Sequence, residues 1–69
     1  MKLSKEQIKE LSEWLNEAID NMDTLHKAIG KPDGVFDALL LGHSLAAYNS
    51  LRAMRDCLVE YERNNCQQA

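Results

Sequence analysis

Apolar residues recur every three or four positions through the first half of the chain. They are Ile8, Leu11, Leu15, Ala18, Met22, Leu25 and Ile29. This alternation is typical of a helix with one face in coiled-coil-like packing. Ser4 precedes the stripe as an N-cap, and Gln7 completes a capping box. Gly30 follows as a natural C-terminal cap, so the pattern predicts a helix over about 4–29.

The second half of the chain carries two apolar stripes at helical spacing. The first comprises Leu40, Ser44, Ala47, Leu51, Met54, Leu58 and Tyr61. The second comprises Ala38, Leu41, Leu45 and Tyr48, and it ends before Arg52 and Arg55. A helix with two apolar stripes is expected to be buried on two sides. The pattern predicts a helix over about 35–63, followed by a polar, frayed tail over 64–69.

The link between the two predicted helices has the composition of a turn. Residues 30–34 read Gly-Lys-Pro-Asp-Gly, in which the proline ends the helix and favours a turn. Long helices joined by a short link pack as antiparallel neighbours. Folding back places Leu15 on Leu51 and brings the small residues Ala18 and Ala47 opposite each other for a close approach. The predicted fold class is all-α, an antiparallel two-helix hairpin in a single domain of all 69 residues.

Scaffolds of this size usually need disulfides, a metal or oligomerisation to be stable. Cys57 and Cys66 lie nine residues apart, roughly 13 Å along a helix, which is too far for a disulfide. They are expected to be reduced thiols of a cytosolic protein. His26 and His43 have no partner at zinc-ligand spacing, so neither a metal nor another cofactor is expected.

Oligomerisation is the remaining source of stability for this small scaffold. The second stripe supports it, because this stripe has no partner within the hairpin. We expect pairing into a homodimeric helical bundle. The predicted interface residues are Ala38, Leu41, Gly42, Leu45, Tyr48 and Arg52. Gly42 costs roughly 1 kcal/mol relative to alanine inside a helix. Two interpretations of it remain open: a kink or break in the helix, or a close crossing by another helix at Gly42 and Ala46.

The net charge of −3 is concentrated in one part of the chain. Residues 1–23 contain three lysines and six acidic residues, which accounts for all of it. Five acids lie opposite the apolar stripe of the first helix, and we call them the acid strip: Glu6, Glu10, Glu13, Glu17 and Asp20. The simplest interpretation is a solvated face. The more specific interpretation is a docking strip for a basic protein, such as a DNA-binding domain. In that interpretation the partner-binding residues are Glu10, Glu13, Trp14, Glu17 and Asp20.

Composition argues against several other classes of function. The acidic pI near 5.2 argues against direct binding to nucleic acid or to an anionic membrane. The longest apolar region, Val35 to Tyr48, is too short for a bilayer, and the N-terminus lacks a signal-peptide core, so a cytoplasmic protein is expected. No phosphate loop, nucleophile elbow or His-Glu-His motif is present. An enzyme is therefore not expected.

The whole chain resembles small phage-encoded quorum-sensing anti-activators. The resemblance lies in its length, the acidic capped helix from Ser4, and the stretch Gly42-His43-Ser44-Leu45-Ala46-Ala47-Tyr48. It implies a helical homodimer that binds the DNA-binding domain of a LuxR-type transcription activator and prevents promoter binding. It also implies inhibition of a pilus-assembly ATPase.

Two other classes stay open from the residues alone. A helical co-chaperone or adaptor would escort a partner helix on the Leu41–Leu45 stripe and bind almost independently of salt. A ligand-sequestering oligomer would hold a small anion between Arg52 and Arg55.

Overall fold

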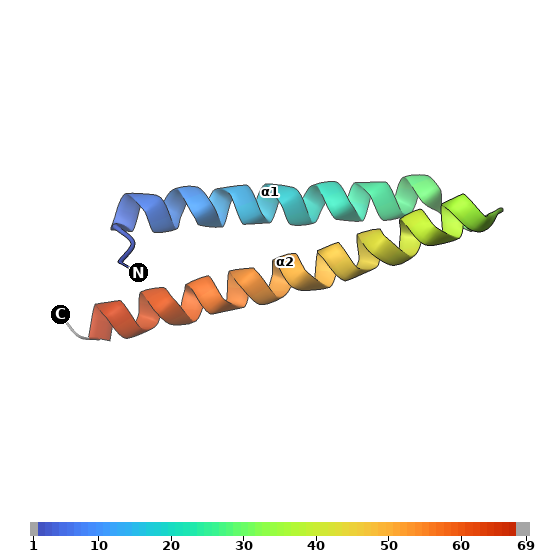
Figure 1. The fold of residues 1–69 in the computed structure, drawn as a ribbon. Helices are drawn as coiled ribbons and strands as arrows, with labels where there is room; N and C mark the ends of the chain where they lie inside the picture. The colour runs from blue at the N-terminus through green and yellow to red at the C-terminus, as the bar shows by residue number, and fades with distance from the viewer. Residues whose placement is uncertain (1, 68–69) are drawn as a thin grey trace.

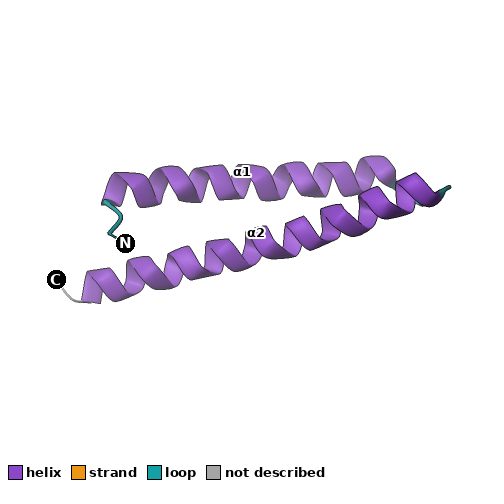
Figure 2. Ribbon diagram, in the orientation of Figure 1, coloured by secondary structure: helices purple, strands orange, loops and turns teal. Residues whose placement is uncertain are grey.

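The protein consists of two long helices joined by a turn. The computed structural model describes residues 2–67, with side chains through Asn64. Helix α1 spans Lys5–Ile29 and helix α2 spans Val35–Gln67. They pack side by side in opposite directions, so the start of α1 and the end of α2 lie at the same end (Figure 1). No strand occurs within residues 2–67 (Figure 2), and the predicted two-helix hairpin is confirmed.

Both ends of α1 are set by the residues that the sequence pattern indicates. Ser4 Oγ accepts a hydrogen bond from Gln7 N at 3.1 Å, and Ser4 N donates to Gln7 Oε1 at 2.8 Å. At the other end, Gly30 has a φ of 59° and donates its N–H to the carbonyl of His26 at 3.0 Å. Glycine adopts this positive φ without steric cost, which explains why the helix ends there.

Helix α2 differs from its prediction at the C-terminal end. Residues 64–67 are helical although the predicted end lay at about 63, while residues 68–69 and the Cys66 side chain lie outside the described parts. No glycine or proline follows Tyr61 to end the helix. An ion pair of 3.1 Å between Arg63 and Glu60 also supports this turn.

Gly42 does not interrupt α2, so of the two interpretations of this glycine the break is wrong. The helix continues through it, and a Cβ placed on Gly42 would have no atom within 4 Å. No described segment of this chain therefore crosses closely at Gly42.

We expect Gly42→Ala to raise the free energy of unfolding by about 1 kcal/mol, because alanine restricts the unfolded backbone and meets no obstacle in the helix. Urea denaturation followed by circular dichroism measures this change. Loss of stability or of oligomer would instead show that another copy packs against Gly42.

The core lies at the end of the hairpin away from the turn. Ile8, Leu15 and Leu58 form a buried cluster. Leu3, Leu51 and Tyr61 pack against this cluster. Leu3 N also donates a hydrogen bond of 2.8 Å to the Tyr61 hydroxyl, which ties the N-terminal arm to α2.

The helices meet through faces that are only partly rotated from those predicted. Ile19, which lies outside the predicted stripe, is buried, whereas Leu11, which belongs to it, is 40% exposed. On α2, Met54 and Ala47 are exposed, so Ala47 does not form the predicted close approach. In the two stripes predicted to pack on each other, the residues that are buried or half-buried are Ile8, Leu15, Ala18, Met22, Leu25 and Ile29 on α1 and Ser44, Leu51, Leu58 and Tyr61 on α2. The buried or half-buried residues outside these two stripes are Ser12, Ile19 and His26 on α1 and Leu41, Tyr48 and Arg55 on α2.

Polar contacts accompany this rotation. Arg55 donates a hydrogen bond of 3.2 Å to Asn16 Oδ1 on α1. The buried Ser44 hydroxyl donates to the carbonyl of Leu41 at 2.9 Å, so its hydrogen-bonding capacity is used within α2. The helix contact thus includes polar groups that an apolar stripe does not predict.

Candidate partner-binding surfaces

The acid strip lies on the face of α1 opposite the helix contact. All five of its residues are exposed, and no described residue forms an ion pair with them. The nearby Asp23 differs, because it pairs with Lys27 at 3.0 Å. Neighbouring acids three or four positions apart on a helix lie about 5–6 Å from each other. The strip therefore presents a negative potential that the rest of the described chain does not neutralise.

Trp14 lies at the border between the acid strip and an apolar surface. Its side chain is 56% exposed. Helical spacing places Glu10 and Glu17 on one side of it and Leu11 on the other. An exposed aromatic beside charged residues is typical of a binding hot spot.

An apolar groove runs between the helices at the end away from the turn, with a volume of about 530 Å³. Its lining contains no charged residue. The groove residues are Leu3, Leu11, Trp14, Leu15, Ala53, Met54, Cys57, Leu58 and Tyr61. Sequence reasoning missed this groove because it assigned Leu11 and Met54 to the core.

The groove continues toward the turn as an apolar face. Residues seven positions apart lie on nearly the same face of a helix. Leu40 and Ala47 therefore extend the Met54 side of α2, and Ala18 and Leu25 extend the Leu11 side of α1. We call this surface, together with the groove, the apolar face.

The residues predicted for the homodimer interface divide between two environments. Leu41 and Tyr48 are half-buried, and the Tyr48 ring meets the His26 ring edge-on at 5.5 Å between centroids. The other four are exposed: Ala38, Gly42, Leu45 and Arg52. The premise that the whole stripe lacks a partner within the chain is therefore wrong for Tyr48.

Arg52 lies beside the same ring, with its guanidinium carbon 5.7 Å from the Tyr48 centroid. Such a cation–π contact uses the flat face of the guanidinium and leaves the N–H donors in its plane. His26 Nε2 is buried without a hydrogen-bond partner in the described structure.

The described residues contain no group of three or more His, Cys, Asp and Glu side chains that could hold a metal ion. Cys57 is a free, exposed thiol. Neither helix, as far as it is described, has an apolar stretch of the length needed to cross a membrane. The surfaces that stand out are therefore the acid strip and the apolar face.

Comparisons with protein-family models, with curated proteins and with solved structures find no match to this chain. The acid strip and the apolar face are therefore the candidate binding surfaces of this protein.

Proposed function

We propose that this protein is a non-enzymatic inhibitor that acts as a homodimer and binds a basic protein partner. The partner is the DNA-binding domain of a LuxR-type transcription activator, whose binding to DNA is blocked. The observation that supports the proposal is the acid strip, because its five exposed carboxylates have no ion-pair partner among the described residues.

A DNA-binding domain holds the phosphate backbone mainly with lysine and arginine side chains. From Glu6 to Asp20 the acid strip covers roughly 21 Å of helix, so it offers carboxylates to several such side chains at once. An inhibitor bound there competes with DNA for the same cations. Trp14, beside the strip, supplies the apolar contact that lengthens the lifetime of the complex.

The experiment is a kinetic binding measurement between this protein and the purified DNA-binding domain at increasing salt. We expect the association rate constant to fall steeply between low and physiological ionic strength, because screening weakens long-range attraction. Operator DNA should compete with the protein for the domain.

Binding that is indifferent to salt, or a ternary complex with DNA, would contradict the proposal. Salt-independent binding would instead favour an adaptor that uses the apolar face.

A further inference from the structure

The single chain leaves an unusual amount of surface exposed. Its radius of gyration is 15.6 Å, against about 11 Å for a compact domain of this length. Its accessible surface is 5558 Å², roughly 1,100 Å² more than a compact protein of the same mass exposes. A stable interface buries about 800 Å² on each partner. The excess is therefore enough for one complete interface.

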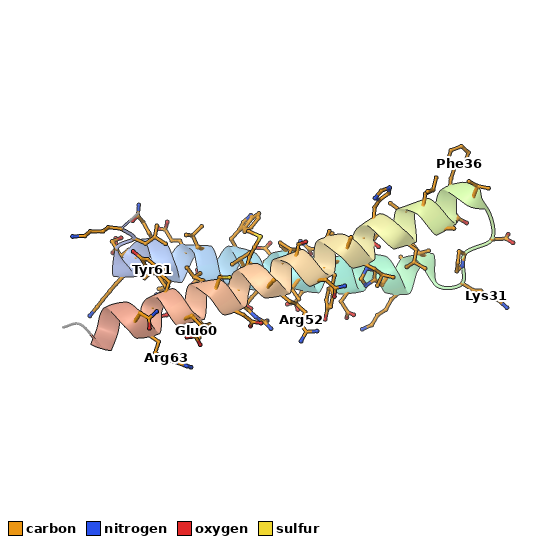
Figure 3. All side chains as sticks on the ribbon, turned by 60° about the horizontal axis from the view of Figure 1, so that its bottom comes forward. Lys31, Phe36, Arg52, Glu60, Tyr61 and Arg63 are labelled. Atoms are coloured by element: carbon orange, nitrogen blue, oxygen red, sulfur yellow. The ribbon has the colours of Figure 1, made fainter. Side chains whose placement is uncertain are left out.

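The apolar face has complementary features at its two ends. The end away from the turn holds the groove, whereas the turn end carries the exposed apolar side chains of Val35, Phe36, Leu39 and Leu40. Phe36 is 85% exposed and projects away from α1, at the opposite end of α2 from Tyr61 (Figure 3). Leu40 follows one turn later and is also exposed. Projections and hollow thus lie at opposite ends of one molecule.

We infer that the apolar face binds a second copy of this chain in antiparallel orientation, with Phe36 and Leu40 of each copy seated in the groove of the other. A two-fold axis near the middle of the hairpin forms both contacts at once, because an isologous interface uses the same patch on both subunits. The result is a four-helix bundle. Each helix is covered on one flank by the other helix of its own hairpin and on a second flank by the second copy.

A second copy fits this surface better than a foreign helix for two reasons. The groove and the side chains that fill it belong to the same chain. Among the described side chains, four apolar residues are buried and no large one is fully buried. Oligomerisation is one of the devices that commonly stabilise a core this small. The acid strip points away from the helix contact and remains outside the bundle. Trp14 lines the groove, so the second copy covers the side of its ring toward Leu11, and a basic partner contacts the side beside the strip.

This inference specifies the interface of the homodimer in the proposed function but does not depend on the acid strip. Its tests use the protein without any partner, so their failure would leave docking of a basic domain untouched. It also moves the interface, because Leu45, at the centre of the stripe predicted from sequence, lies nine residues from Met54 and so on the opposite side of α2.

Sedimentation equilibrium with matched variants tests the interface. We expect a wild-type dimer at micromolar concentration, and at least a hundredfold weaker dimerisation for Phe36→Glu, because a carboxylate would be buried in an apolar groove. Leu45→Glu is the matched control and should remain dimeric. A monomeric wild type overturns the inference, and so does a dimer that Leu45→Glu dissociates and Phe36→Glu does not.

Cross-linking tests the orientation without burying a charge. In a Cys66→Ser background, a short bismaleimide should join the Cys57 thiol of one copy to the thiol introduced by Leu40→Cys in the other. These positions are roughly 25 Å apart within one helix, so only a link between copies is short enough. Peptide mapping that finds mainly links between two Cys57 thiols would overturn the antiparallel arrangement.

Discussion

Reversing Glu10, Glu13 and Glu17 together to lysine should slow association with a basic DNA-binding domain by about ten- to a thousandfold, the range over which electrostatic steering acts. The three side chains are exposed and unpaired within the described structure, so their charge is available to a partner. Single substitutions are a poor test, because an exposed charge contributes about 1 kcal/mol or less. Stopped-flow binding at low salt measures the rate.

A control variant with the same change in net charge separates the strip from the overall charge. Asp33, Asp56 and Glu62 are exposed acids outside the strip, and their reversal to lysine should slow association far less. Circular dichroism and sedimentation establish that both triple variants are folded and in the wild-type oligomeric state. Equal effects of the two triples, or an unchanged salt dependence in the strip variant, would show that the strip is only a solvated face.

Leu15→Ala should lower the free energy of unfolding by about 2–5 kcal/mol, because it removes a buried side chain and leaves a cavity. Leu15 is 4% exposed and belongs to the cluster with Ile8 and Leu58. The loss is comparable to the roughly 3–5 kcal/mol that a core of this size supplies. We therefore expect a largely unfolded variant at room temperature, measured by circular dichroism and urea denaturation.

Leu45→Ala is the control for this prediction, since it makes the same chemical change at a side chain that is 45% exposed. It should lower stability by under about 1 kcal/mol at the same protein concentration, which must be held fixed if the chain associates. Similar losses for the two variants would mean that the helix contact does not centre on Leu15.

The local signals in the sequence predicted the helices well. The capping box at Ser4 and the glycine at position 30 act within a few residues, so the bounds of α1 follow from short-range chemistry. The short Pro-Asp-Gly link likewise required an antiparallel pair. At the end of α2, polar composition was a poor guide, because polar residues that favour helix continue it when no glycine or proline intervenes.

The rotation of each helix could not be predicted in the same way. On α1, every residue of the predicted stripe except Leu11 is buried or half-buried, and Ile19 is buried in addition. One alternative adds Leu11, and the other adds Ile19. The hydrophobic pattern along α1 favours the alternative with Leu11. The observed alternative also depends on contacts between the two helices, such as that of Tyr48 with His26, which the pattern of one helix does not reveal. The groove exists because Leu11 and Met54 lie outside the core, so it could not be predicted either.

The position of the core has a consequence for how the chain folds. Ile8 and Leu58 belong to the buried cluster yet are fifty residues apart in the sequence, whereas Val35 and Phe36 beside the turn are exposed. Closing a loop of that length costs roughly 2 kcal/mol more conformational entropy than closing the five-residue turn. Zippering from the turn would at first gain only half-buried apolar contacts, such as those of Leu25, Ile29 and Leu41, to offset this cost. The rate-limiting event in folding is therefore expected to be the encounter of two largely formed helices at their far ends.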